Sequence, residues 1–302
     1  MDRVITNEFS IKDIERFTGI KAHTLRIWEQ RYHLLKPERT STNIRYYTID
    51  DLRLLLNVAV LIKQGMRISQ IARLSSEERS SKVNHFEHQG GDTTAILDRL
   101  KLAAINLQSI EFDRVINHSI EELGFEKAFE TIIFPFIRLL GILWQTKSIT
   151  AVQEHFASNL IRQKLYGAID KLDIAVGPEA RSVVLYLPEL ELHELSLLYA
   201  HYRFKKAGYL SVYLGQSVPL EDLLLAYENI KPSLFFSVFT SYPAGSHVQD
   251  YIDRLQQMFK GIHVPFYITG LQMIEQESKR LPGNICVLHS LSDFDKMLQS
   301  RG

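Results

Sequence analysis

The sequence predicts a multidomain protein of the α + α/β class, and three observations along the chain support this. In the first quarter, apolar residues recur at helical spacing on either side of a short charged hairpin. Residues 93–175 also show apolar residues at helical spacing. After Gly177 and Pro178, five short β-branched and aromatic runs, at residues 182–187, 210–214, 234–239, 264–268 and 285–288, alternate with helical patterns, which is typical of a parallel sheet with helices on both faces. The 302 residues, 45% of them hydrophobic, suffice for two or three domains.

Two short helices are expected near the start of the chain. Ser10 can cap the first helix, and Gly19 ends it in a tight turn. The second, over residues 21–32, would bury Leu25 and either Trp28 or Ile27 on one side while polar side chains point outward. A second helix of this kind is the usual major-groove reader of a helix-turn-helix.

A hairpin over residues 36–47 follows and carries arginine, threonine, asparagine and tyrosine side chains. Arg45, followed by two tyrosines, has no packing role that the sequence explains. Such side chains on a helix and a wing, outside the core, suit phosphates and base edges. Further helices beginning near Thr48 and Arg67 would complete a compact unit, so the sequence predicts binding to DNA.

The sequence motifs of this region are more specific than those of a generic helix-turn-helix. Thr-Leu-Arg-Ile-Trp-Glu at 24–29, Leu-Lys-Pro at 35–37 and Asn-Ile-Arg-Tyr-Tyr at 43–47 resemble the winged N-terminal domain of the MerR family of transcription regulators. The resemblance covers residues 1–75 and implies DNA contacts from both helix and wing. The implied contact residues are Thr24, Arg26, Tyr32, Arg39, Asn43, Arg45 and Tyr46.

Charge separates the same region from the rest of the chain. Lysines and arginines number 35 overall, as do the acids, so the net charge is zero. Residues 1–75, however, hold 13 basic against 8 acidic side chains, and the remainder holds 22 against 27. A basic head on an acidic body is expected of a DNA-binding domain joined to a sensor or oligomerisation module. Because phosphate contacts make affinity salt-sensitive, binding at physiological salt is expected to need a dimer or tetramer.

The middle of the chain is predicted to be a linker followed by a helical bundle. Residues 76–92 are polar, contain glycine and lack an apolar period, so they are interpreted as a linker. Residues 93–175 show about four amphipathic patterns, which predict a four-helix bundle. With no long helix expected after the head, homo-oligomerisation is assigned to the C-terminal module.

Residues 176–302 are predicted to form a Rossmann-like, doubly wound parallel sheet, in which ligands bind at the carboxyl ends of the strands. The residues at those ends resemble the signature of the cobalamin-binding Rossmann-like domain: an acid, any residue, His, two residues and Gly, then a Ser-containing loop and a Gly-Gly pair. The resemblance implies that His193 is the lower cobalt ligand, with Glu191 as its orienting partner. It also implies that Ser237 and Thr240 border the nucleotide tail and that Gly270 lets the backbone approach it.

A further motif lies in the predicted bundle. Trp144, nine residues, and Glu154-His155 resemble the Trp-x9-Glu-His element on the upper face of cobalamin in light-responsive repressors of the CarH and LitR type. These share the three-part order of head, bundle and sheet. The resemblance implies a repressor that senses adenosylcobalamin, with light as a possible input, through its oligomeric state.

Two positions depart from the cobalamin signature and keep a second interpretation open. Ser196 replaces the glycine after the histidine, and Leu271 replaces the second glycine of the pair. The alternative is the same DNA-binding regulator with a sensor that binds no cobalamin or another ligand. A third class, a cobalamin-dependent enzyme subunit, is disfavoured because the chain supplies no substrate barrel, and no catalytic residue is predicted.

The remaining sequence features bear on membrane insertion, secretion and the redox environment of the protein. No apolar run approaches the roughly 20 residues of a membrane helix, and no secretory pattern opens the chain. The single cysteine, Cys286, lies in a predicted strand and is expected to be buried and inert. One cysteine excludes a disulfide within the chain and a cysteine-based metal site, and it fits a reducing cytoplasm.

Overall fold

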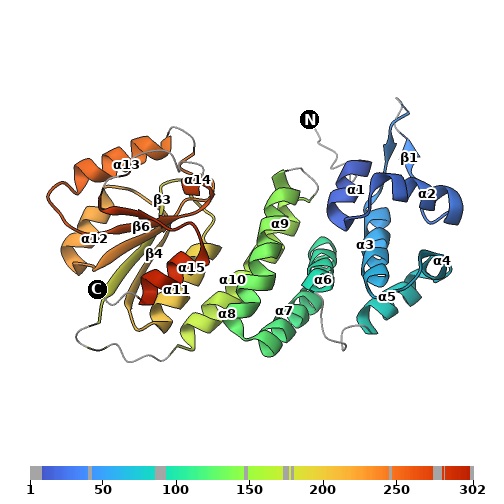
Figure 1. The fold of residues 1–302 in the computed structure, drawn as a ribbon, viewed down its shortest axis with the longest axis horizontal. Coiled ribbons are helices and arrows are strands. Elements are labelled where there is room, and N and C mark those ends of the chain that lie inside the picture. Colours follow the sequence, from blue (N-terminus) through green and yellow to red (C-terminus); the bar gives the residue numbers. More distant parts are fainter. Residues whose placement is uncertain are drawn as a thin grey trace. The chain divides into compact units, whose positions relative to one another are not determined.

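The computed structural model describes residues 9–39, 43–85, 93–145, 149–172, 177, 180–244, 247–274, 281 and 283–299. The chain divides into two compact units, Met1–Leu160 and Ile161–Gly302. The predicted fold class is confirmed: a helix-turn-helix head and helical bundle precede a parallel α/β sheet (Figure 1). Among the described residues, none of the helices is long and apolar enough to cross a membrane.

The head, residues 9–85, is built from short helices with well-defined ends. Its elements are α1 (Ile11–Thr18), α2 (Ala22–Tyr32), β1 (Glu38–Arg39), β2 (Arg45–Tyr46), α3 (Ile49–Lys63), α4 (Ile68–Ile71) and α5 (Ser76–His85). Ser10 and Asp13 form a capping box at the start of α1, and Gly19 ends that helix with a φ of 72°. Thr48 and Asp51 form the corresponding box for α3. The predicted helix starts near Thr48 and Arg67 are therefore confirmed.

The interpretation of residues 76–92 as a linker is wrong for Ser76–His85, which form α5. Local capping explains the helix: the Ser75 hydroxyl accepts from the backbone N–H of Glu78, whose carboxylate accepts from the N–H of Ser75. Arg79 also donates to the carbonyl of Leu74. A helix that is polar on all sides gives no apolar period, so the periodicity criterion missed it. Residues 86–92 of the predicted linker lie outside the described residues.

The bundle consists of helices α6 to α10, the elements being α6 (Thr93–Ile105), α7 (Ser109–Leu123), α8 (Phe125–Ala128), a π-helical turn η2 (Phe129–Ile133), α9 (Phe134–Gln145) and α10 (Ala151–Asp170). Elements α8, η2 and α9 follow one another without a break, so they count as one interrupted helix among four. Buried aromatic rings, including Phe112 and Phe136 with centroids 5.6 Å apart, fill the interior. The boundary between the two compact units falls inside α10, and the bundle–sheet boundary near residue 175 stays a prediction.

The second unit holds a five-stranded parallel sheet in the order β4-β3-β5-β6-β7. The strands are β3 (Ser182–Pro188), β4 (Leu210–Val218), β5 (Leu234–Val238), β6 (Phe266–Thr269) and β7 (Ile285–Val287), close to the predicted runs. Helices α11 (Leu195–Lys206) and α15 (Leu291–Gln299) share one core with the sheet. The other core holds α12 (Asp222–Ile230), α13 (His247–Met258) and α14 (Leu271–Ile274) (Figure 1).

Cys286 lies in β7 as predicted, but it is half-buried where full burial was expected. Burial raises the pKa of its thiol above the usual range, and a hydrogen bond from Tyr267 opposes this shift. A raised pKa leaves little thiolate at neutral pH, which is consistent with low reactivity.

Candidate nucleic-acid interface and cofactor site

Helix α2 separates its core face from its outer face as the sequence predicted. Leu25 and Trp28 are buried, so Trp28 packs in the core of the head. Arg26 is exposed, and Thr24 and Tyr32 are partly exposed. The helix therefore presents an arginine, a hydroxyl and a phenol outward, which are side chains suited to phosphates and base edges.

The predicted wing is a two-stranded antiparallel hairpin in which Arg39 lies opposite Arg45 and Glu38 opposite Tyr46. The Arg39 guanidinium donates to Oδ1 of Asn43 across 2.7 Å. Asn43 itself has a φ of 64°, a conformation that asparagine tolerates better than most residues. Three of the predicted DNA contacts, Arg39, Asn43 and Arg45, are thus exposed together on one hairpin.

A carboxylate that the sequence analysis did not single out joins the wing to the reading helix. Glu29 of α2 accepts a 2.5 Å hydrogen bond from the hydroxyl of Tyr47, which is fully buried. Burial and then this hydrogen bond raise the pKa of the Tyr47 phenol well above its usual value. The second Glu29 oxygen lies 3.8 Å from Nε of Arg45. Tyr47 is therefore a structural residue, and Glu29 places Arg45 relative to the helix.

In the second unit, the sheet places Glu191 and His193 after the carboxyl end of β3. Glu191 is fully buried, whereas 59% of the His193 side chain is exposed. Oε1 of Glu191 lies 2.6 Å from Nδ1 of His193 and also accepts from the His193 backbone N–H. An ionised carboxylate can only accept, so Nδ1 carries the proton and the lone pair of a neutral ring lies on Nε2.

The Glu191 carboxylate is a hub for the loop that follows β5. Its Oε2 accepts from the backbone N–H groups of Thr240, Ser241 and Tyr242 at 3.1, 2.6 and 2.9 Å. Burial raises the pKa of Glu191, but the hydrogen bonds from the His193 ring and from the backbone N–H groups of Ser241, His193 and Tyr242 outweigh it and lower the pKa to about 2. Thr240 thus contributes its backbone N–H to the hydrogen bonds around Glu191. Ser241, which the sequence analysis missed, places its hydroxyl 3.1 Å from Nδ1 of His193.

The low pKa of Glu191 predicts acid lability of the second unit. Its value of about 2 lies below the ordinary 4.5, so the stabilisation is complete above pH 4.5 and is lost as the pH falls through 2. Between about pH 5 and pH 2, we expect wild type to lose about 3 kcal/mol more unfolding free energy than Glu191→Gln, which cannot titrate. Urea unfolding followed by circular dichroism checks this. Equal pH slopes in the two proteins would contradict it.

Glu194, the neighbour of His193, is fixed from two other elements of the second unit. Arg162 of α10 pairs with its Oε1 across 2.6 Å, and the hydroxyl of Tyr213 in β4 donates to its Oε2 across 3.0 Å. The loop between β3 and α11 is therefore held on both sides of the histidine, by Glu191 and by Glu194. An imidazole on a loop held in this way is preorganised, which lowers the entropy cost of using it as a ligand.

Two residues expected to border a ligand have internal roles in the structure. Ser237 is buried in β5, and its hydroxyl donates to the carbonyl of Tyr186 across 2.8 Å. At Gly270, a Cβ would come within 2.3 Å of the carbonyl oxygen of Phe239, at a φ of 112°. Internal packing alone therefore requires glycine at this position. Contact of either residue with a nucleotide tail stays a prediction.

The two departures from the signature lie on the surface. Ser196 is exposed within α11, where a helical backbone has no need of glycine. Leu271 opens α14 with 57% of its surface exposed. Neither side chain enters a core, so the Glu191–His193 arrangement forms without glycine at these positions.

The bundle residues of the Trp-x9-Glu-His motif lie at the end of α9 and the start of α10. Trp144 is 53% exposed, which is unusual for so large an apolar side chain. His155 is exposed and its Nδ1 lies 2.7 Å from Glu154. The backbone N–H of Ile149 donates to the carbonyl of Leu143, which ties the connection between the two helices back to α9. An exposed aromatic ring and a carboxylate-paired imidazole are thus available on this part of the bundle.

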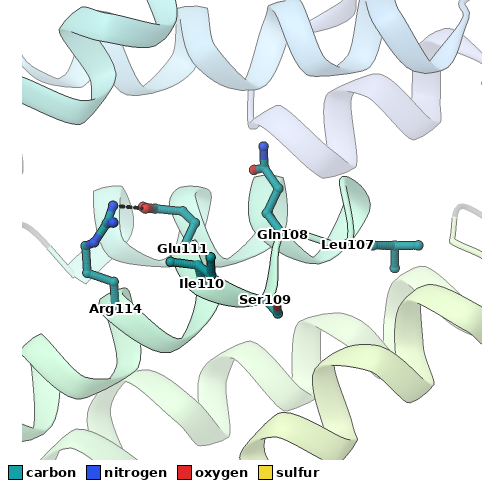
Figure 2. A pocket seen from close by; sticks show the side chains of 6 residues that line it. All are labelled: Leu107, Gln108, Ser109, Ile110, Glu111 and Arg114. Carbon is teal, nitrogen blue, oxygen red and sulfur yellow. Dashed lines mark hydrogen bonds and ion pairs between the residues drawn. The ribbon is translucent and has the colours of Figure 1, made fainter.

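A hollow of about 330 Å³ lies elsewhere, at the turn between α6 and α7 (Figure 2). Its lining residues are Leu107, Gln108, Ser109, Ile110, Glu111 and Arg114. The charged groups already pair with each other, since Glu111 accepts from Arg114 at 2.7 Å and from Arg99 at 2.6 Å. None of the predicted site residues lines this hollow, and its chemistry does not point to a ligand.

Two parts of the chain match known protein families. Residues 9–78 match the MerR HTH family regulatory protein, and residues 96–166 match the B12 binding domain. The second match covers most of the helical bundle. The chain therefore joins a MerR-type helix-turn-helix to a B12 binding domain.

Whole-chain similarity points to transcription regulators. The HTH-type transcriptional repressor CarH of Myxococcus xanthus is 26% identical over 270 residues, 87% of this chain and 88% of the relative. The repressor CarA of the same organism is 28% identical, with 74% of each chain covered. A monomethylamine corrinoid protein from Methanosarcina barkeri shares the fold, with a TM-score of 0.54 and 14% identity, over 69% of this chain and 99% of that protein.

Proposed function

We propose that this homologue of the CarH and CarA repressors is a DNA-binding transcription repressor whose C-terminal part binds cobalamin through His193. The observation that carries the proposal is the fully buried, ionised Glu191 holding an exposed imidazole at the carboxyl edge of the sheet. Metal-binding histidines commonly donate their second ring N–H to a carboxylate in this manner. The pair therefore fits the lower axial ligand of a corrin-bound cobalt.

In this proposal, several residues around His193 have defined tasks. Glu191 fixes the ring orientation and keeps the proton on Nδ1, while Ser241 adds a hydroxyl beside the same nitrogen. Glu194 and Arg162 hold the loop in place. Trp144, Glu154 and His155 are proposed as further cofactor-binding residues. When bound, adenosylcobalamin would supply a light-sensitive cobalt–carbon bond.

The head binds the operator through the exposed face of α2 and the wing. The proposed contacts comprise both elements, namely Thr24, Arg26, Tyr32, Arg39, Asn43, Arg45 and Tyr46. A cofactor changes DNA binding only if it has different affinities for the free and assembled states. We assign this difference to homo-oligomerisation, as a dimer or tetramer, through the C-terminal module. In this scheme the cofactor is a signal, and the protein catalyses no reaction.

A second candidate is a regulator with the same fold that binds no cobalamin. It is favoured by the internal roles of Ser237 and Gly270, which account for both residues without a ligand. Leu271 in place of the second glycine of the signature points the same way.

One titration separates the two candidates. Purified protein is mixed with adenosylcobalamin in the dark without oxygen, and absorbance, gel filtration and operator binding are followed before and after green light. The proposed function requires stoichiometric co-elution and a change of size that alters operator affinity. Operator binding without any co-eluting cobalamin would instead support the second candidate.

A further inference from the structure

A buried ion pair on α6 lies where the bundle contacts the DNA-binding head. Asp98 and Lys101, one turn apart on this helix, are only 1% and 6% exposed and are paired with each other. Lysine and aspartate are rarely buried to this degree without a structural task. The Lys101 ammonium also donates across 2.6 Å to the carbonyl oxygen of Phe17, a residue of α1 in the head. A bundle side chain therefore bonds directly to the backbone of the head.

The accepting carbonyl explains why a lysine is suitable here. Phe17 lies in the last turn of α1, where carbonyl groups have no partner within the helix and carry the negative end of its dipole. Gly19 satisfies the carbonyl of Glu15, and Lys101 satisfies that of Phe17. Helix α6 also packs against α3 of the head. The bundle thus supplies the C-terminal cap of a helix in the DNA-binding head.

The same helix is fastened to the motif in the bundle. At the end of α6, the carbonyl of Ile105 accepts a 2.9 Å hydrogen bond from Nε2 of Gln153. Gln153 immediately precedes Glu154 and His155 in α10. Helix α6 also packs against α7, η2 and α9. A single helix therefore contacts both the head and the residue next to the proposed cofactor ligands.

We propose that Lys101 is a latch that holds the DNA-binding head on α6, so that head and bundle behave as one body. Through Gln153, the same helix would transmit cofactor binding to the head; this second part rests on the proposed function. The orientation of α2 and the wing then follows the bundle. Such a latch would let the sensor set the geometry in which paired heads meet the operator.

The two tryptophans of the chain provide matched reporters, because Trp28 lies in the head and Trp144 in the bundle. Trp28→Phe and Trp144→Phe are made in the full chain, and urea unfolding is followed by fluorescence without cobalamin or DNA. With Lys101 present, we expect the two reporters to share one midpoint. With Lys101→Met, the head reporter should unfold about 1 M urea before the bundle reporter.

Two further variants make the result decisive. Lys82→Met removes an exposed lysine of α5 and should leave the midpoints coincident. Asp98→Leu with Lys101→Met replaces the buried pair by apolar side chains, which commonly preserves folding, while still removing the bond to Phe17. Separate midpoints in this double variant support the latch. Coincident midpoints in both Lys101 variants overturn it.

The transmission step has its own readout. The double variant should bind adenosylcobalamin with the wild-type spectrum and bind operator normally without cofactor, while the cofactor-dependent change in operator affinity falls at least several-fold. A full cofactor response in this variant would overturn transmission through α6. If wild type binds no cobalamin, the proposed function fails, and the urea experiment still decides the latch.

Discussion

Replacing Arg45 with alanine is expected to weaken operator binding by tenfold to hundredfold, or about 1–3 kcal/mol per head. Arg45 lies on the exposed wing, and its guanidinium is placed by Glu29, which Tyr47 fixes in turn. Because the Arg45 guanidinium is already oriented, it needs little reorganisation to contact a phosphate or a base edge. Its removal is therefore expected to lose most of that contact with DNA. Fluorescence anisotropy with labelled operator at several salt concentrations measures both the affinity and the salt slope, which should fall by about 1.

Arg53 provides the matched control for this experiment. The Arg53 side chain is 41% exposed, against 40% for Arg45. It also lies beside an acid, since it pairs with Asp50 at 2.9 Å. Because Arg53 lies on α3 and not on the wing, Arg53→Ala should leave affinity within about twofold. Equal losses in the two variants would remove the wing from the interface and leave only a general charge effect.

Replacing His193 with alanine is expected to abolish the spectral signature of cobalamin ligated by a protein histidine. The variant removes the only part of the Glu191–His193 pair that reaches the surface, and Glu191 is fully buried. Glu191→Gln should weaken cobalamin binding by about 10- to 100-fold, because a neutral amide has one acceptor oxygen where the carboxylate has two, and it cannot accept from both the ring and the loop. Absorbance titration in the dark, with gel filtration, gives both the spectrum and the affinity.

His247 supplies the control for the histidine experiment. It is exposed and lies beside an acid, Asp250, at 3.7 Å, but it belongs to α13 and not to the loop after β3. His247→Ala should retain the wild-type spectrum. Persistence of the histidine-ligated spectrum in His193→Ala would show that another residue provides the lower ligand.

Much of the fold followed from periodicity and capping. Alternating runs of β-branched and aromatic residues predicted the five strands, and Ser10, Gly19 and Thr48 marked helix ends that the structure confirms. Helix α5 was missed because its sequence carries no apolar stripe, so only its capping residues, Ser75 and Glu78, indicate it. A pattern of hydrophobicity cannot detect a helix that is polar on every side.

The candidate sites likewise combine contacts between residues close in sequence, which spacing predicts, with contacts between distant residues, which it does not. Glu191 and His193 are two residues apart, so their pairing is encoded by spacing alone. Ser241 lies 50 residues from Glu191, and no sequence spacing predicts that its backbone N–H meets that carboxylate. At Gly270, a glycine suited to a ligand also has an internal explanation, because a Cβ there would meet the carbonyl of Phe239.

The sequence by itself determined most of the elements, their order and many of the residues that face outward, because hydrophobic period, capping and short motifs act over a few neighbouring residues. Only the tertiary structure decided which distant groups meet. Glu29 and Tyr47 are 18 residues apart, and Lys101 and Phe17 are 84 apart. Such partners are selected by how buried faces pack, and burial gives each pair its strength because it removes competing water.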